Sequence, residues 1–411
     1  MLSLPALRLA LAAFIQPVLS ASIPETQHTA LSTRDVSACR LQAPAGVYLS
    51  LGFDYAGPCA PSTGTLRAFM FFVDFPDHPA PSTEDPQALY DEYFSAAPGW
   101  YAQASYGRLA LNVTLEGDGS SSAPRFVRMG ARADSYGWQR GLTYEAHQTY
   151  VLDALDAYTA ATGRAAPTGY DVLYVVPTTR AAPISFSPTF MGEVRQRGSP
   201  SSAPPVAGKA VTIGMDAYAT WKSKVINHET GHTMCLPDLY PEGRDVGLYV
   251  GGWDMMGYIL GPSPDYFAWS QWRLGWISDA QVECVSGPGS SAHTLSALEL
   301  DDGTRGGTKA VVVRHNGTDV LVAEARTRAG VDSASCATGV LLYTVSVATA
   351  TGNGPVRVLD TKPNSGGCGG HEKNDAPLST VGTSFTVPGW NVKVTLTGQC
   401  GSQYTIRVDV S

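Results

Sequence analysis

The feature that most constrains the fold of this chain is the run H-E-T-G-H at residues 228–232. Residues four apart lie on one face of an α-helix, so a helix here presents the imidazoles of His228 and His232 to a single metal ion. The preceding residues 221–227 contain neither proline nor glycine and permit that helix. Glu229 lies beside the pair and can accept a proton from a metal-bound water. The run therefore predicts zinc-assisted hydrolysis, and two surface histidines on an ordinary helix are the alternative.

A hydrolytic zinc site needs a third protein ligand and one open position, and Asp238 is the best candidate for that ligand. Pro237 cannot continue a helix and disfavours helical geometry at the residue before it, so the chain should turn there. Such a turn brings Asp238 back towards the metal. Glu242 and His147 are weaker substitutes for this ligand, and an aspartate in a solvent-exposed loop is the alternative.

A second unusual segment follows, with the sequence G-G-W-D-M-M-G-Y at residues 251–258. Combined with the histidine run and Asp238, this segment resembles the immune inhibitor A family of metallopeptidases, within the metzincin clan. Shorter similarities at residues 105–109, 267–276 and 339–343 extend the resemblance over most of the chain. The resemblance implies a zinc endopeptidase that acts on protein or peptide substrates.

The resemblance also assigns roles to the residues of the site. It implies that His228, His232 and Asp238 hold Zn²⁺, and that Glu229 is the general base that activates water. In this clan a tight turn with a methionine, the Met-turn, runs beneath the zinc. Met256 matches that methionine, as a structural residue and not a ligand.

The resemblance also bears on two residues close to Met256, and at one position the chain departs from the family pattern. Tyr258 occupies the place where some metzincins keep a tyrosine that stabilises the reaction intermediate, and Met255 is the alternative for the Met-turn. The family usually has glycine where this chain has Cys235, because glycine readily adopts a left-handed turn at a helix end. A cysteine in that conformation costs about 1–2 kcal/mol. Cys235 is expected to pack as a small apolar residue, or alternatively to reach the zinc.

The order of apolar patterns along the chain predicts two parts. Residues 61–277 are expected to form an α+β, metzincin-like zinc-protease domain, in which a mixed sheet packs on helices. Residues 278–411 are expected to form an all-β, sandwich-like domain, because short β-like runs alternate there with Gly, Ser and Asn. Buried strands are predicted at 66–73, 172–176 and 210–213, and helices at 87–103, interrupted near Pro98, and at 144–161.

Substrate binding needs a free strand edge in the fold that the resemblance implies. An extended peptide pairs with that edge through main-chain hydrogen bonds, which explains how a protease accepts many sequences. Residues 210–214 are the candidate edge. The Ser- and Pro-rich segment 182–205 is predicted to be a long loop that either shapes the cleft or is mobile.

The N-terminal sequence predicts export. Residues 1–21 combine a basic residue, an apolar stretch too short to span a bilayer and small residues before a cut, which is typical of a secretory signal peptide. The mature protein should therefore be secreted and extracellular, without a membrane anchor. Residues 22–60 have no strong periodic pattern and are expected to be a propeptide or an N-terminal strap.

Seven cysteines suit an oxidising compartment, and their odd number leaves at least one unpaired. Cys39 and Cys59 are expected to pair with each other, and a zinc-blocking role for Cys39 in a zymogen is the alternative. Cys235 is the expected unpaired thiol. The remaining four cysteines can form two disulfides in three ways, which the sequence does not distinguish. They are Cys284, Cys336, Cys368 and Cys400.

Charge excludes one class of partner. The net charge of −8 is spread along the chain without a basic cluster, so nucleic acid is not expected as a partner.

Structural Ca²⁺ at aspartates such as Asp118 and residues 301–302 is a weaker expectation, since turn chemistry explains them equally well. Asn112 and Asn316 each begin a glycosylation sequon. The sequence makes no prediction of oligomeric state.

Two rivals to the protease hypothesis are also consistent with the sequence. One is a catalytically silent secreted binding protein that keeps the metzincin frame, for which the departure at Cys235 is the sequence support. The other keeps the zinc but hydrolyses another substrate, such as a glycopeptide. An inactive homologue would more often have lost Glu229 or one of the histidines, which favours the protease.

Overall fold

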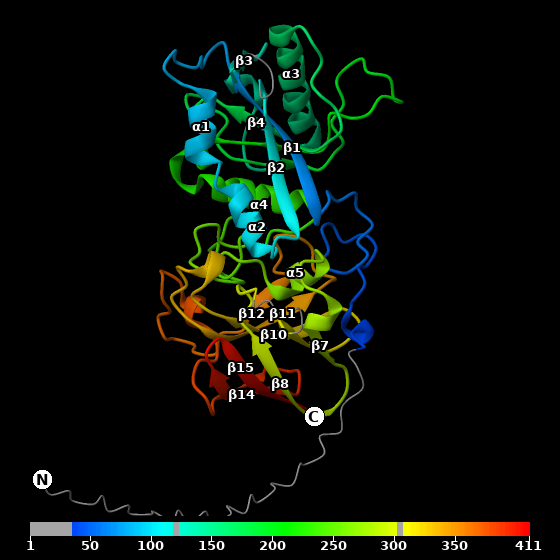
Figure 1. Cartoon of the computed structure of the whole chain (residues 1–411), viewed down its shortest axis with the longest axis vertical. Coiled ribbons are helices and arrows are strands. Elements are labelled where there is room, and N and C mark those ends of the chain that lie inside the picture. Colours follow the sequence, from blue (N-terminus) through cyan, green and yellow to red (C-terminus); the bar gives the residue numbers. More distant parts are fainter. Residues whose placement is uncertain (1–34, 118–122, 302–306) are drawn as a thin grey trace, which may run out of the picture. The chain divides into compact units, whose positions relative to one another are not determined.

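A computed structural model describes residues 35–117, 123–301 and 307–411. The predicted signal peptide and two of the aspartates considered for calcium, Asp118 and Asp302, lie outside these residues. The described chain is mixed α/β, with one sheet and most helices in its first part and mainly strands in its second part (Figure 1). Among the described helices, none is long and apolar enough to cross a membrane.

The first sheet has six strands in the described chain, in the order β2-β1-β4-β6-β5, and β3 also pairs with β1. All of its pairings are parallel except that of β5 with β6. Its strands are β1 (Gly64–Asp74), β2 (Leu109–Leu115), β3 (Phe126–Arg128), β4 (Tyr170–Pro177), β5 (Thr189–Phe190) and β6 (Ala207–Thr212). The three strands predicted in this part of the chain are confirmed as β1, β4 and β6, although β6 ends one residue before the predicted end at 213.

Helices cover both faces of this sheet, which explains why its central strands are almost continuously apolar. The helices are α1 (Pro86–Tyr93), α2 (Ala97–Ala104), α3 (Tyr144–Thr162), α4 (Ser223–Thr233) and α5 (Ala268–Arg273). Alternate residues of β1 point to opposite faces, so Met70 packs in a core with α1, α2 and α4, whereas Phe71 packs against α3. The predicted helix is interrupted, but at residues 94–96 and not at Pro98. Pro98 lies in the first turn of α2, where proline is tolerated.

The edge strand on this side of the sheet is β5 and not the predicted residues 210–214, so that prediction was wrong; β2 is the opposite edge. β6 lies inside the sheet, with β4 on one side and β5 on the other. β5 belongs to the long segment 182–205, which folds back so that Thr189 and Phe190 pair antiparallel with β6. A strand of two residues gives no periodic signal in the sequence, which is why the edge was assigned to its neighbour.

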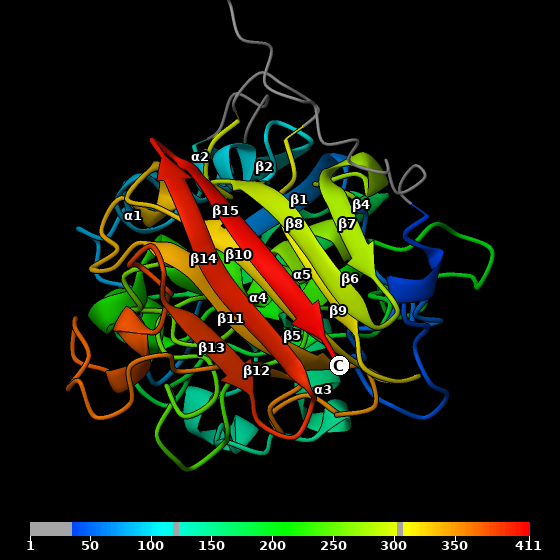
Figure 2. The ribbon, with the colours of Figure 1, turned by 90° about the horizontal axis from the view of Figure 1, so that it is seen from below.

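After residue 277 the chain forms two sheets that enclose a common core. One has the order β12-β11-β10-β9-β7, and the other, nearest the viewer in Figure 2, has the order β13-β14-β15-β8. Their strands are β7 (Val282–Val285), β8 (Gly289–Ser296), β9 (Ala310–Arg314), β10 (Asp319–Arg326), β11 (Gly339–Ser346), β12 (Val356–Val358), β13 (Ser384–Val387), β14 (Val392–Cys400) and β15 (Gln403–Val410). Apolar side chains of both sheets, such as Leu321 and Ile406, pack together between them. The predominance of strands that was expected after residue 277 is present.

The five-stranded sheet is buried on both faces. One face packs on the four-stranded sheet, and the other packs on the first part of the chain. There the ring of Tyr343 on β11 lies 4.4 Å, between centroids, from that of Phe267 before α5. Neighbouring residues of β10, Leu321 and Val322, therefore belong to two different apolar cores.

A group of buried charges lies at this junction. Arg326 on β10 has no exposed surface and forms ion pairs with Glu324, at 2.6 Å, and with Asp332. The guanidinium also donates a hydrogen bond to the main-chain oxygen of Asp265. We refer to these four residues and the nearby buried Glu299 as the arginine cluster. Arg326 supplies the positive charge that this group of carboxylates needs.

Residues 36–60 form a strap that is tied to the body of the protein near both ends. Three disulfides are present, Cys39–Cys284, Cys59–Cys235 and Cys336–Cys368. The predicted pairing of Cys39 with Cys59 is therefore wrong, because the strap carries them to separate anchors at β7 and at the end of α4. Cys235 is not the unpaired thiol either. In the described chain the free cysteine is Cys400, which is exposed.

Candidate metal centre

The histidine run lies on α4, as the spacing predicted. The helix ends at Thr233, and Cys235 takes the left-handed conformation (φ 64°) that was expected at this position. Its disulfide to Cys59 holds this turn against the strap. The chain then reverses at Pro237, which returns Asp238 to the two histidines.

Three candidate ligand atoms converge beyond this turn. Nε2 of His228 and Nε2 of His232 each lie 3.2 Å from Oδ1 of Asp238. Glu229 also presents a carboxylate oxygen, and this oxygen and one nitrogen of each imidazole all lie within 4.8 Å of one another. Asp238 is the better third ligand because its oxygen is equally close to both nitrogens. We refer to His228, His232 and Asp238 as the ligand cluster.

Both imidazole rings are oriented from outside the ligand cluster. Nδ1 of His228 lies 2.9 Å from the main-chain oxygen of Met255, and Nδ1 of His232 lies 2.8 Å from that of Leu236. A carbonyl oxygen only accepts hydrogen bonds, so each Nδ1 donates its hydrogen to the main chain and each ring turns Nε2 towards Asp238. Two such nitrogens and a carboxylate suit Zn²⁺, whose histidine ligands usually have this kind of outer support.

The charges of the ligand cluster depend on one another. Burial lowers the pKa of His232, but the Asp238 carboxylate outweighs burial and raises this pKa to about 9. Burial raises the pKa of Asp238, but the histidines, His232 above all, outweigh it and hold the pKa well below its usual range. The cluster thus binds a proton strongly, at the position that a metal ion would take.

Glu229 lies beside the ligand cluster and is nearly fully buried. Burial raises its pKa, although His232 and His228 oppose the shift. Oγ1 of Thr189, on β5, lies 2.7 Å from Oε2 of Glu229 and orients the carboxylate. The other oxygen, Oε1, has no hydrogen-bond donor among the described residues. Glu229 is therefore held in one orientation with one oxygen available for proton transfer.

Met256, the methionine of the predicted Met-turn, lies against α4 between the two histidines. A Cβ atom at Gly231 would meet Sδ of Met256 at 2.5 Å, so only glycine allows the sulfur to approach the helix this closely. Asp254 fixes the turn, since its two oxygens accept the amide hydrogens of Met256 and Phe267, both at 2.7 Å. Asp254 is fully buried, and burial raises its pKa to about 7.

The second part of the chain contributes to the position of the ligands. The amide of Asp238 donates to Oγ1 of Thr351 at 2.8 Å, although 113 residues separate the two. The main-chain oxygen of Asp238 accepts from the amide of Gly352 at 3.0 Å. Arg326 of the arginine cluster donates to the main-chain oxygen of Trp253, at the start of the Met-turn segment. No local pattern in the sequence could indicate these contacts.

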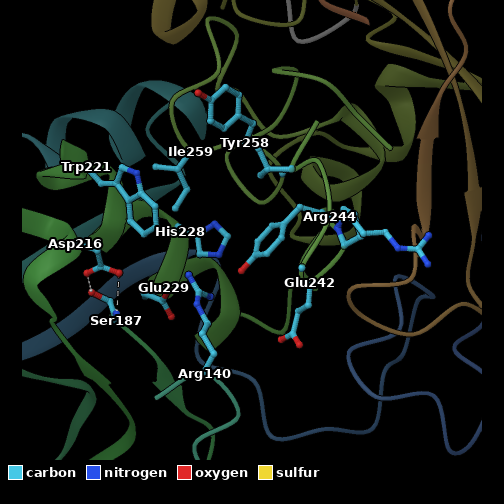
Figure 3. Close-up of a pocket in the computed structure, with 15 residues that line it drawn as sticks. Arg140, Ser187, Asp216, Trp221, His228, Glu229, Glu242, Arg244, Tyr258 and Ile259 are labelled. Carbon is cyan, nitrogen blue, oxygen red and sulfur yellow. Dashed lines mark hydrogen bonds between the residues drawn. The ribbon is translucent and has the colours of Figure 1, made fainter. Parts of the chain in front are cut away.

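Two cavities flank the ligand cluster, a large one of about 740 Å³ and a small one of about 210 Å³. Glu229, Tyr240 and Arg140 line both of them. The large cavity extends past His228 (Figure 3), and the small cavity extends past Asp238. Because the two share this lining, a chain-like ligand that passes from one cavity to the other crosses the ligand cluster.

The structure places Tyr258 differently from what the sequence suggested, and it brings another tyrosine, Tyr240, to the centre. Tyr258 lines the large cavity, but its hydroxyl points away from His228 and Glu229 (Figure 3). The ring of Tyr240 lies 6.0 Å, between centroids, from that of His228. Burial raises the pKa of Tyr240, and the carboxylates of Asp238 and Glu229 raise it further, so its hydroxyl stays protonated. No described residue accepts a hydrogen bond from this hydroxyl, which leaves it free to donate to a ligand.

Arg140 was not singled out from the sequence, and neither were Tyr240 and Thr189. The guanidinium of Arg140 reaches into the large cavity (Figure 3) and lies 5.2 Å from the centre of the Phe186 ring. No carboxylate of the described residues forms an ion pair with it. In the sequence, the one feature that could have drawn attention to these three residues is closeness to the run at residues 228–232. Tyr240 lies close to that run, whereas Arg140 and Thr189 do not.

The two substitutes considered for the third ligand lie elsewhere. His147 is buried on α3, where its Nε2 lies 3.0 Å from Oγ1 of Thr212, and burial lowers its pKa to about 3. Glu242 lines both cavities without joining the group of ligand atoms. Asp238 is thus the candidate that the geometry brings to both histidines.

Comparison with known proteins adds no assignment. No family model matches the chain, and no curated protein matches it significantly. The residues of the centre and their geometry are therefore the basis for a function.

Proposed function

We propose that this protein is a secreted zinc endopeptidase with a metzincin-like catalytic region, similar to the immune inhibitor A family. The observation that carries the proposal is the ligand cluster, in which two imidazole nitrogens lie 3.2 Å from one carboxylate oxygen. Main-chain carbonyls fix both rings from behind, as in zinc sites generally. Three protein ligands beside a cavity leave room for a water or a substrate oxygen, which distinguishes a catalytic site from a closed structural one.

Zn²⁺ bound here would polarise the carbonyl of the peptide and lower the pKa of water. The residues of the chain supply the remaining steps. Glu229 accepts a proton from the attacking water at Oε1 and delivers it to the nitrogen of the departing amine. Thr189 holds Oε2 and so keeps the carboxylate directed at the reacting atoms. Tyr240 donates its hydroxyl hydrogen to the carbonyl oxygen as negative charge develops there.

A peptide substrate fits the free edge of β5. The strand carries Thr189 next to Glu229, so a peptide that pairs with this edge passes directly over the general base. Main-chain pairing accepts many sequences, and the two cavities then select side chains. The substrate class is therefore an extended polypeptide.

Export is the part of the proposal that rests on the cysteines and the sequons. Three disulfides are compatible with an oxidising compartment. Asn112 and Asn316 are both exposed, so either sequon can be glycosylated without disturbing the core.

The test is cleavage of casein by the purified protein, with and without a zinc chelator, together with an assay of bound metal. We expect chelator-sensitive cleavage that added zinc restores. Glu229→Ala should keep stoichiometric zinc and lose turnover, whereas His232→Ala should lose both. Glu145→Ala, an exposed glutamate on α3, is the control that should match wild type.

Two results would contradict the proposal. Cleavage by Glu229→Ala at the wild-type rate would exclude its role as general base. Stoichiometric zinc without cleavage of any peptide would instead favour the silent binding protein.

A further inference from the structure

The strap, residues 36–60, is part of the folded core. Its residues Leu41, Leu51 and Phe53 are at most 4% exposed and belong to the same apolar core as α4 and the Met-turn. The indole nitrogen of Trp269 on α5 donates to the main-chain oxygen of Leu51 at 2.9 Å. Removal of the strap would uncover this apolar surface and break two disulfides. The strap is therefore part of the fold and not a loosely attached segment.

The middle of the strap is a turn with an unusual backbone. Leu49 has a φ of 51°, in the left-handed region that leucine rarely adopts. Its amide donates to the hydroxyl of Tyr55 at 3.1 Å, and Oγ of Ser50 donates to the main-chain oxygen of Val347 at 2.6 Å. Such a conformation persists when its surroundings enforce it. The result is that the side chain of Leu49 is buried, whereas that of Tyr48 is 54% exposed.

This turn forms one wall of the small cavity. Tyr48 and Leu49 line it from the strap, and Pro188 and Met191 line it from the segment that contains β5. Asp238 of the ligand cluster lies at the same cavity. The strap and the substrate-binding edge thus face each other across a space of about 210 Å³ beside the ligands.

The cavity as a whole has a mixed lining, because Arg140, Asp238 and Glu242 also border it, but the wall formed by the strap and the segment of β5 is mainly apolar. A leucine, a proline, a methionine and a half-exposed tyrosine ring offer apolar surface that a hydrophobic side chain would remove from water. The volume is below the range of pockets for whole small molecules, which suits a single side chain. A peptide on β5 that crosses the ligand cluster towards the large cavity would place one side chain here.

We infer that Tyr48 and Leu49 form a substrate subsite for one apolar side chain, and that the strap stays in the active enzyme to supply it. The inference rests on the proposed function and adds a specificity to it. Tyr48 is the specificity-determining residue, since its exposed ring can pack on the substrate without being needed for the fold.

The first test compares cleavage kinetics of two peptides that differ at one position beside the cleaved bond, leucine in one and glycine in the other. Tyr48→Ala should raise KM for the leucine peptide about tenfold and leave kcat and the glycine peptide unchanged. Tyr48→Phe should behave as wild type, because the ring and not the hydroxyl makes the contact. Val381→Ala, which removes a similarly exposed apolar side chain far from the cavity, is the control.

An equal loss for both peptides, or no loss for either, would overturn the subsite. Higher activity of Tyr48→Ala would show that the strap obstructs the centre, and would also overturn it. Mass spectrometry of the active protein provides the second test, in which we expect residues 36–60 to be present. An active form that begins after Ala60 would refute the retention of the strap.

Binding separates this inference from the proposed function. Fluorescence anisotropy of the labelled leucine peptide with Glu229→Ala protein needs no turnover. We expect Tyr48→Ala in that background to raise Kd about tenfold for the leucine peptide alone. If the wild type cleaved nothing but this difference appeared, the protease proposal would fail and the subsite would stand. If Kd did not change, the subsite would be refuted whatever the activity.

Discussion

The ligand cluster and the arginine cluster are both buried groups of charges, but they are completed in different ways. In the arginine cluster the positive charge is Arg326 itself, which is paired with Glu324 and Asp332. In the ligand cluster two imidazole nitrogens face one carboxylate oxygen, and the chain supplies no lysine or arginine to the group. The first group therefore contains its own cation, and burial raises the pKa of its surplus carboxyl groups Asp265 and Glu299, whereas the second contains no cation of this kind and is open to a proton or a metal ion.

This difference shows which property marks a functional site in a buried polar region. Raised carboxyl pKa values do not, because burial raises the pKa of Glu299 in the arginine cluster to about 8 and also raises that of Glu229. What distinguishes the ligand cluster is the convergence of two imidazole nitrogens on one carboxylate oxygen, together with the adjoining cavities. Substitutions that act on only one of the two clusters can test this distinction.

The largest expected effect is that of Arg326→Met on stability. This change leaves several buried carboxyl groups without a countercharge, which typically costs about 3–5 kcal/mol of unfolding free energy. Urea denaturation should show the loss. Arg407→Met, which breaks an exposed ion pair with Asp409, should cost less than about 1 kcal/mol. A similar small cost for Arg326→Met would mean that the arginine cluster is not electrostatically coupled.

The pH dependence of stability should follow the arginine cluster. In the folded protein, burial raises the pKa of Glu299 to about 8. In the unfolded chain the same group should have its ordinary pKa of about 4.3. The stabilisation that Glu299 contributes to the folded state is fully present below the pKa of the unfolded chain, and it is lost as the pH rises through the pKa of the folded protein. We expect the unfolding free energy to fall by about 3 kcal/mol between pH 5 and pH 8 through this group. Glu299→Gln, which preserves the shape, should flatten that dependence, and an unchanged slope would contradict the assignment.

Two tyrosines provide a matched pair of hydroxyl deletions. The hydroxyl of Tyr343 donates to Glu324 at 2.7 Å, whereas that of Tyr240 has no described acceptor. Tyr240→Phe should lower kcat about 100-fold, as removal of oxyanion donors does, with little effect on stability or zinc content. Tyr343→Phe should lower stability with little effect on kcat. Tyr258→Phe should change neither, and a loss of kcat there instead of at Tyr240 would restore the original prediction from the sequence.

The smallest expected effect is that of Thr351→Val on zinc affinity. Oγ1 of Thr351 accepts a hydrogen bond from the amide of Asp238, and loss of such outer support typically weakens metal binding at least tenfold. Competition with a chromophoric chelator would measure the change. Thr383→Val, at an exposed threonine far from the centre, should leave zinc affinity unchanged. If both variants bound zinc as wild type does, the second part of the chain would not support the ligands.

The parts of the centre that the sequence predicted depend on short-range geometry. His228 and His232 were paired by the period of the helix, and Asp238 by the turn that Pro237 enforces a few residues later. The strands were predicted where burial on both faces gives a continuous apolar run, as in β1. In each case the physical cause acts over fewer than about ten residues, so the pattern is visible in the chain itself.

The parts that the sequence did not predict depend on where distant segments meet. Thr189 reaches Glu229 from a two-residue strand in a long loop, and Thr351 reaches Asp238 from the second part of the chain. The disulfides of Cys39 and Cys59 depend on the path of the strap. The orientation of Tyr258 depends on side-chain packing, which a motif does not specify.

The route of the strap has a consequence for how the protein must be made. Cys39 leaves the ribosome long before its partner, which follows 245 residues later. At a typical rate of about 5–20 residues per second, the wait is roughly 12–50 seconds. For most of that interval, until Cys235 follows, Cys59 is the only other thiol that has been made. The emerging chain must either remain reduced or reopen an early crosslink, so its yield should depend on a disulfide isomerase in the producing cell.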